Sequence, residues 1–351
     1  MVQANTFLQP KVYIDDTEIT SDLQGRVSFT GNNQLNKLTV KLSHPDIQHQ
    51  ALLYKKIKFF LNNGSSDTVP TFTGIITQVT PSEKETSITA LDPRILISGK
   101  DGHKVRLTDT DNYDGYTVGA FLYSFITEYV NTEEKRLGVD MLTDTNPPIS
   151  LTGQRTQRGT VYTIAKNVVK KVIDSDSDFL NPLTYFFDVI ESEKGPQLVI
   201  KKEKALNEAP ITSFTYDDGL IKYSYKRRTP KNTAIYKGGK FIYSNRPTGQ
   251  SVVSINTTDF KKRGIPLESV AEQRQLAIEQ VLLEQQEKDE ISITVSKGYD
   301  LGLGSLVRLN IPEDDISGTH RVVGKSISFG NKMTCTLKLN RKPLKLSTFI
   351  Q

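Results

Sequence analysis

The sequence predicts a mainly β protein with helical insertions, an α+β fold that contains two similar β-barrel domains. Segments of alternating apolar and polar residues, separated by turns rich in Gly, Pro and Asn, occupy both ends of the chain. The segment 290–341 is the clearest example, and the segment 38–91 repeats its order of elements. Two other stretches have helical spacing, one within 103–180 and one at 267–288. We therefore expect a small helical domain between the barrels and one long helix in the second half.

The internal repeat rests on four pairs of short matches that occur in the same order. The matched segments are 38–40 with 293–295, 53–59 with 303–309, 74–79 with 318–323, and 87–91 with 334–337. Any one of these matches would mean little, because short strands resemble each other. Four in one order favour a duplicated β-domain.

Changes of period along the chain predict the domain boundaries. Apolar residues recur at helical spacing in 116–130 and in 160–173, which predicts a pair of helices. Alternation resumes at 184–190 and 197–201, around a turn at 193–195. The predicted divisions are a first β-barrel at 1–98, a helical insertion at 99–180, a β-hairpin segment at 181–218, a second β-barrel with the helix 267–288 at 219–345, and a C-terminal tail at 346–351.

The composition is that of an ordinary protein of two or three domains. The 351 residues carry a net charge of +5, which is far from the strongly basic balance typical of nucleic-acid-binding proteins. No apolar run approaches the ~18 residues of a membrane span. The N-terminus lacks the basic segment and apolar core of a signal peptide, so we expect the chain to be made and folded in the cytoplasm. The single cysteine, Cys335, excludes an intrachain disulfide and a thiolate metal cluster.

Motifs for catalysis and metal binding are missing from the sequence. It contains no nucleophile elbow, phosphate-binding loop or paired metal-binding histidines. The loop with Asp109, Asp111 and Asp114 has the acidic spacing of a calcium loop, but Phe121 stands where the final acid should be. Whether these aspartates bind an ion stays open. The chain also has no Trp to stack on a sugar. We expect no catalytic residue, no cofactor, no resident metal and no enzymatic activity.

The densest basic region follows residue 222, where Lys and Tyr alternate as they would on the two faces of a strand. Its candidate interface residues are Tyr225, Lys226, Arg227, Arg228 and Lys231. Exposed strand edges are commonly guarded by Lys and Arg, so we interpret the region as an edge strand or a subunit interface. The alternative is a nucleic-acid-binding surface that combines cations with aromatic rings.

The layout resembles the tail hub, or baseplate hub, proteins of tailed bacteriophages, including the late control and Mu-like hub proteins. The resemblance covers nearly the whole chain and rests on loose patterns of glycines and aliphatic residues. The segments that carry it are 38–42, 56–59, 72–79, 88–92, the predicted helix 267–288, 293–295, 302–307, 318–323 and 333–339.

The resemblance implies a structural virion protein of the tail tip or baseplate, assembled in the cytoplasm of the bacterial host. In such hubs a homotrimer presents six similar barrels to the six-fold tail tube, so the first barrel would be of the tube-facing type. The opposite side holds a three-fold central spike, the bore passes DNA, and other baseplate or distal tail proteins surround the ring. No spike or lysozyme segment follows residue 351, so we expect the spike to be another chain, and the type of tail stays open. The alternative is a phage-associated glycan-binding or carbohydrate-active β-protein.

Overall fold

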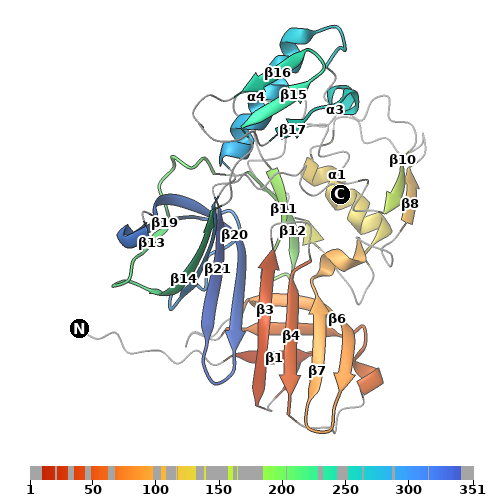
Figure 1. The fold of residues 1–351 in the computed structure, drawn as a ribbon. Coiled ribbons are helices and arrows are strands. Elements are labelled where there is room, and N and C mark those ends of the chain that lie inside the picture. Colours follow the sequence, from red (N-terminus) through yellow and green to blue (C-terminus); the bar gives the residue numbers. More distant parts are fainter. Residues whose placement is uncertain are drawn as a thin grey trace.

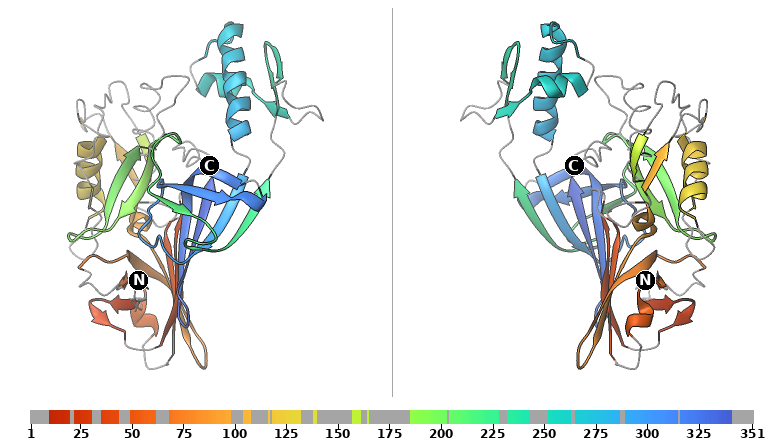
Figure 2. Two further views of the ribbon diagram at one scale, coloured as in Figure 1. Left: turned by 90° about the vertical axis from the view of Figure 1, so that its left-hand side faces the viewer. Right: turned by 90° about the vertical axis from the view of Figure 1, so that its right-hand side faces the viewer.

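The computed structural model shows a β-rich chain with a small α/β module at one end (Figures 1 and 2). The residues described are 10–19, 22–30, 35–43, 49–61, 68–97, 104–107, 116, 118–131, 138–139, 157–160, 164, 185–202, 204–227, 232–242, 252–262, 265–286, 289–314 and 316–340. In this part of the chain no helix is long and apolar enough to cross a membrane.

Two groups of strands, far apart in the sequence, form the first and second halves of the main sheet. The first half contains β1 (Lys11–Ile14), β2 (Thr17–Glu18), β3 (Leu23–Thr30), β4 (Lys37–Leu42), β5 (Lys56–Phe60), β6 (Phe72–Pro81) and β7 (Thr86–Leu91), with short 3-10 turns at His49–Leu52 and Pro93–Leu96. The second half contains β13 (Thr212–Phe214), β14 (Leu220–Arg227), β18 (Asp289–Val295), β19 (Leu306–Ile311), β20 (Ile316–Phe329) and β21 (Thr334–Asn340), with a 3-10 turn at Pro312–Asp314.

The two halves form one 13-stranded sheet, in the order β14-β18-β21-β20-β3-β4-β7-β6-β5-β1-β2, with β13 and β19 branching from β20. The same pairing order occurs twice in it. In the first half β3 pairs with β4, β4 with β7, β7 with β6 and β6 with β5. In the second half β14 pairs with β18, β18 with β21, β21 with β20 and β20 with β19. The fold is therefore duplicated strand by strand.

Local landmarks make the two halves equivalent residue by residue. A β-bulge follows Ile76 in the pairing of β6 with β7, and another follows Val322 in the pairing of β20 with β21. The carbonyl of Ile76 accepts a hydrogen bond from the Tyr54 N–H, and that of Val322 from the Gly304 N–H, both at 2.9 Å. Tyr54 and Gly304 also share a positive φ, 66° and 81°. Ile76 therefore corresponds to Val322, and β3 corresponds to β14.

This equivalence corrects the alignment predicted from the sequence. The match of 53–59 with 303–309 is right, but the other three matches are two residues out of register. Gly74, for example, pairs with Ile57 and therefore corresponds to His320, which pairs with Val307, and not to Gly318. A shift of two residues leaves every side chain on the same face of the sheet, so an alternating pattern cannot detect it.

The prediction of two barrels needs a second correction. Among the described residues no strand pairing closes either half into a barrel, because the sheet runs from β14 at one edge to β2 at the other. The reason is the long strand β20, whose first part pairs with β19 and whose last part pairs with β3 of the other half. Within the described strands, the two halves thus pair with each other, and neither half pairs back on itself.

The segment between the two halves combines a helix with strands. It contains β8 (Lys104–Leu107), α1 (Val118–Tyr129), β9 (Gly138–Val139), β10 (Gln157–Thr160), β11 (Tyr185–Ile190) and β12 (Gln197–Lys202). The hairpin β11–β12 has its turn at 193–195, where the sequence predicts one. The strand β9 pairs with β12, so a single small sheet crosses the predicted boundary at residue 180. Most of the predicted helix 160–173 lies outside the described residues.

A separate small module interrupts the second half. It contains β15 (Thr233–Tyr236), β16 (Gly239–Ile242), β17 (Val252–Ser254), α3 (Thr257–Lys262) and α4 (Val270–Gln286). The helix α4 lies inside the range 267–288 and packs on β15, with Leu276, Ala277 and Val281 in the core of the module. Val270, the first residue of α4, is apolar but 52% exposed. The strands at 233–236 and 239–242 thus belong to this module and not to a second barrel.

Candidate functional site

The joint between the two halves is the best-defined surface of the sheet. Residues 316–321 of β20 pair with β19, whereas 324–329 pair antiparallel with 25–30 of β3. The register places Ser326 opposite Ser28 and Phe329 opposite Gly25. The last part of β20 is buried by this pairing, with Ile327 fully covered. The joint is therefore a complete β-ladder between two copies of one unit.

Close packing on the core side fixes the joint. The Phe329 ring stacks on Phe59 of the other half, with ring centroids 4.7 Å apart. A Cβ atom at Gly25 would lie 2.6 Å from the Phe329 ring and 2.3 Å from the Thr39 carbonyl oxygen. Position 25 therefore has room only for glycine. One core extends through both halves of the sheet.

Polar contacts complete the joint. The Arg26 guanidinium donates to Ser326 Oγ at 2.7 Å. On the other face, Lys325 Nζ lies 4.7 Å from the centroid of the Phe29 ring and donates to the Tyr299 carbonyl at 3.0 Å. Burial lowers the pKa of Lys325. The joint thus holds one buried cation against one aromatic ring, an interaction that gains strength when it is removed from water.

Among the described strands, two edges have no partner, because each half contributes only one side of this joint. The counterpart of β3 is β14, which ends the strand order of the sheet. The counterpart of 324–329 in β20 begins at Gln78 in β6, and no described strand pairs with the outer edge of β6 beyond Ile75. Thr80 and Pro81 are exposed there, whereas Ser326 is buried in the joint. The chain therefore presents two edges of the kind that pair with each other inside it.

The structure places part of the predicted basic region on one of these edges. Tyr225 is half-buried against the core, and Lys226 is exposed on β14. Arg227 is the last residue of β14, while Arg228 and Lys231 lie outside the described residues. Their role as a subunit interface stays a prediction. The sequence analysis did not identify the edge of β6 as a candidate interface. A proline at the end of a predicted strand is nevertheless a signal for an edge.

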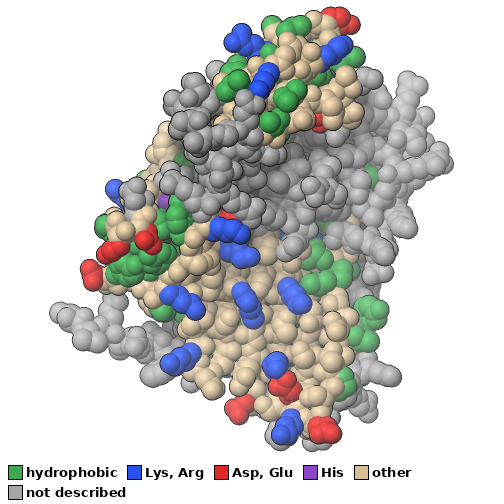
Figure 3. All heavy atoms as spheres, viewed as in Figure 1, with side chains coloured by type: hydrophobic (Ala, Val, Ile, Leu, Met, Phe, Trp, Pro, Cys, Tyr) green, Lys and Arg blue, Asp and Glu red, His purple; other side chains and the backbone are tan. Residues whose placement is uncertain are grey.

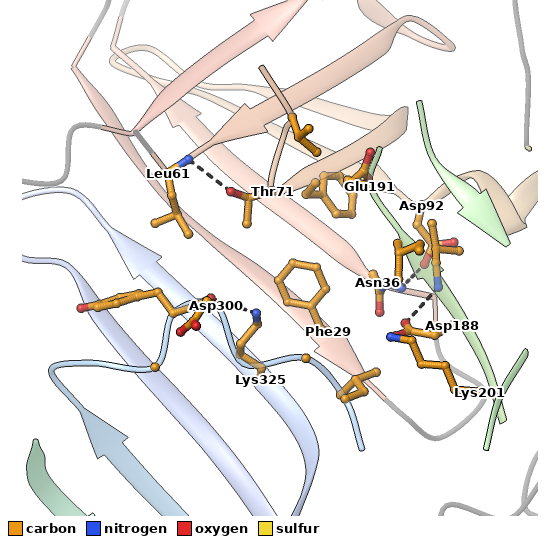
Figure 4. Close-up of a pocket in the computed structure, with 18 of the residues that line it drawn as sticks. Phe29, Asn36, Leu61, Thr71, Asp92, Asp188, Glu191, Lys201, Asp300 and Lys325 are labelled. Atoms are coloured by element: carbon orange, nitrogen blue, oxygen red, sulfur yellow. Dashed lines mark hydrogen bonds and ion pairs between the residues drawn. The ribbon is translucent and has the colours of Figure 1, made fainter. Parts of the chain in front are cut away.

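A cleft of about 680 Å³ lies between the two halves and the hairpin β11–β12 (Figure 4). Glu191 follows β11 and accepts hydrogen bonds from the Thr73 N–H at 2.6 Å and from Thr73 Oγ1 at 2.8 Å. Burial raises the pKa of Glu191 to about 7. Lys201 pairs with Asp188 at 2.7 Å on the hairpin itself. The hydrogen bonds between Thr73 and Glu191 connect the hairpin to the first half. The sequence gives no signal to choose Glu191 among 40 acids.

The raised pKa of Glu191 predicts a pH dependence of stability. The ordinary value is 4.5, so between pH 4.5 and 7 the folded state binds the proton more tightly than the unfolded state. The free energy of unfolding should therefore fall as pH rises through this window, by up to about 1.4 kcal/mol per unit for this group. We expect urea titrations at pH 5, 6, 7 and 8 to show this slope in the wild type relative to Glu191→Gln, which cannot ionise. Parallel curves for the two proteins would contradict the prediction.

No described cluster of His, Cys, Asp or Glu is arranged to hold a metal ion. Asp109, Asp111 and Asp114 lie outside the described residues, so whether they bind an ion stays open. Cys335 is buried, and its burial raises the pKa of the thiol to about 11. This cysteine is therefore a protonated core residue and a poor nucleophile.

The fold of this chain is similar to that of several phage tail proteins. A tail protein from Neisseria meningitidis matches with a TM-score of 0.63 and 14% sequence identity over 94% of this chain and 95% of that one. A 43 kDa tail protein of the prophage MuSo2 from Shewanella oneidensis matches with a TM-score of 0.62 and 9% identity over 97% and 98%. A type VI secretion component of E. coli, described as structurally similar to T4 phage tail proteins, matches with a TM-score of 0.53 and 9% identity over 95% and 78%. No family model and no curated protein sequence matches the chain. The resemblance to phage tail and baseplate proteins is thus confirmed for the fold.

Proposed function

We propose that this protein is the structural hub of a phage tail tip or baseplate. The observation that supports this proposal most strongly is the repeated strand order of the main sheet, which gives each chain two equivalent units joined side by side. Three chains would present six such units to a six-fold tail tube and a three-fold assembly to a central spike. The duplication therefore has a physical purpose in an adapter between two symmetries.

The polar face of the sheet supports the proposed passage of DNA through the ring. Figure 3 shows Lys and Arg side chains spaced over this face of the molecule. Its exposed basic residues, at positions that alternate with the core, are Arg26, Lys37, Lys41, Lys222, Lys226 and Lys338. Ser and Thr side chains stand between them, as in the cross-strand pair Thr294 and Thr336. Acids stand beside two of these cations, since Glu85 pairs with Lys41 and Glu290 lies opposite Lys226. A lining of hydroxyls and partly neutralised cations would hold a passing polyanion only weakly.

The other proposed partners are the tail tube protein, a separate central spike chain and neighbouring baseplate proteins, with the virion tail tip as location. No catalytic role is proposed. The glycan-binding or carbohydrate-active alternative would use the acids of the cleft. There Glu191 is engaged by Thr73 and Asp188 by Lys201, which leaves these carboxylates poorly placed for acid–base chemistry on a sugar.

The mass of the purified protein tests the proposal. We expect light scattering to give three times the chain mass of 39.3 kDa, either alone or after mixing with the tail tube protein. Averaged images of negatively stained particles should then show a ring of six similar lobes. A protein that stays monomeric at every concentration, even with its tube protein, would overturn the proposed hub function. Glycan arrays would then test the glycan-binding alternative.

A further inference from the structure

We propose that the chains join head to tail by pairing β14 of one chain with residues 78–81 of β6 in the next, in the register of the intrachain joint. The inference rests on the proposed trimeric hub and adds the residues that form its contacts. The choice of the two strands and of their register comes from the internal duplication. Each half offers the same two edges, and one edge from each half is already used in the joint between β20 and β3.

The register follows by transferring each strand to its counterpart. Ile76 corresponds to Val322, so Thr80 corresponds to Ser326. Val27 pairs with Leu38, and its counterpart Tyr225 pairs with Ile291 of β18. The corresponding pairs across the new joint, with the β6 residue first, are Val79 with Arg227, Thr80 with Lys226, Pro81 with Tyr225 and Ser82 with Ser224 of the neighbouring chain.

The backbone of β6 is oriented for this pairing. The Ser82 N–H bonds to the Glu85 carbonyl at 2.8 Å, so residue 82 faces β7. Because successive residues of a strand face opposite neighbours, Thr80 also faces β7, while Val79 and Pro81 face the open edge. Proline has no N–H, so Val79 is the donor and Pro81 offers only its carbonyl. The joint between chains is therefore a short ladder, shorter than the one inside the chain.

The side chains also fit this register better than they fit a symmetric alternative. Lys226 lies opposite the hydroxyl of Thr80, and the half-buried Tyr225 ring lies opposite the exposed Pro81. An antiparallel pairing of two β14 strands centred on Ser224 would instead place Lys222 opposite Lys226. Like charges directly opposite each other destabilise a sheet. The charges therefore favour β6 as the partner of β14.

Disulfide trapping tests the register. Thr80 and Lys226 form a pair without hydrogen bonds between them, where Cα atoms lie about 4.5 Å apart and a disulfide can close. We expect oxidised Thr80→Cys/Lys226→Cys protein to run as a covalent trimer on a non-reducing gel. Each single variant should run as a monomer, since the native Cys335 is buried. The matched control is Ser28→Cys/Ser326→Cys, the same position in the intrachain joint, which should lose both free thiols without a change of mass.

The outcomes separate this inference from the proposed hub. Six-lobed rings in which both introduced thiols of the Thr80→Cys/Lys226→Cys variant stay reduced would overturn the register while the hub stands. Equally efficient linkage in Thr80→Cys/Ser224→Cys, two residues away, would also overturn it. A variant that gives neither rings nor covalent species under conditions in which the control disulfide forms would overturn the hub as well.

Discussion

Replacing Asp92 by alanine should lower the free energy of unfolding by about 3–5 kcal/mol, because it removes the buried carboxylate that forms an ion pair with the buried Arg94 guanidinium. Asp92 and Arg94 are 1% and 3% exposed. The carboxylate accepts from Arg94 Nη2 at 2.7 Å and from the Arg94 N–H at 2.9 Å, and it also accepts from the Asn36 N–H. One side chain thus neutralises a cation, caps a 3-10 turn and connects that turn to the start of β4.

Glu85→Ala is the matched control, because it breaks an ion pair in the same half of the sheet. Lys41 Nζ and Glu85 Oε1 are 2.6 Å apart, but both side chains are exposed. We expect a loss of less than about 1 kcal/mol, as for other surface pairs. Urea denaturation of the two variants beside the wild type measures the difference. Equal losses would mean that water reaches Arg94 and that the pair is not buried in solution.

The duplicated fold could be predicted from the sequence because strands have a period of two and the matched segments keep their order. The residue register could not, since Val40 and Leu42 are equally good counterparts of Val295 in an alternating pattern. The bulges after Ile76 and Val322 and the hydrogen bonds to their carbonyls distinguish the two alignments. A bulge depends on the strand that pairs with it. Its position therefore cannot be predicted from the pattern of apolar residues in one strand.

The pairing between the two halves was missed for a similar reason. Whether a strand closes its own barrel or pairs with another unit depends on contacts between residues about 300 positions apart, such as Arg26 with Ser326. The basic region after residue 222 was identified because Lys and Arg on a strand indicate an edge, and β14 lies at the edge of the described sheet. The helix 267–288 was predicted from its spacing, but its partner strands were assigned to the wrong unit. Helical spacing identifies the buried face and says nothing about what covers it.

Replacing Phe329 by alanine should have a comparably large effect, a loss of about 3–5 kcal/mol, because it leaves a cavity in a packed core. Phe329 is 4% exposed and contacts Phe59 across the two halves. The residue opposite Phe329 is Gly25, which has no side chain that could fill the cavity. No neighbouring strand can therefore move in to fill the cavity without losing the ladder between β20 and β3.

The module provides a control that separates stability from assembly. Phe260 is fully buried in the core of the small module, so Phe260→Ala also removes a large ring from a core. Both variants should unfold at lower urea concentration. Only Phe329→Ala should also weaken the proposed trimer, because the proposed ring needs the two halves of each chain in a fixed arrangement, and Phe329 stacks on Phe59 across the two halves. Light scattering at decreasing concentration measures this difference. If both variants dissociate alike, the loss of global stability explains the effect, and the joint has no special part in assembly.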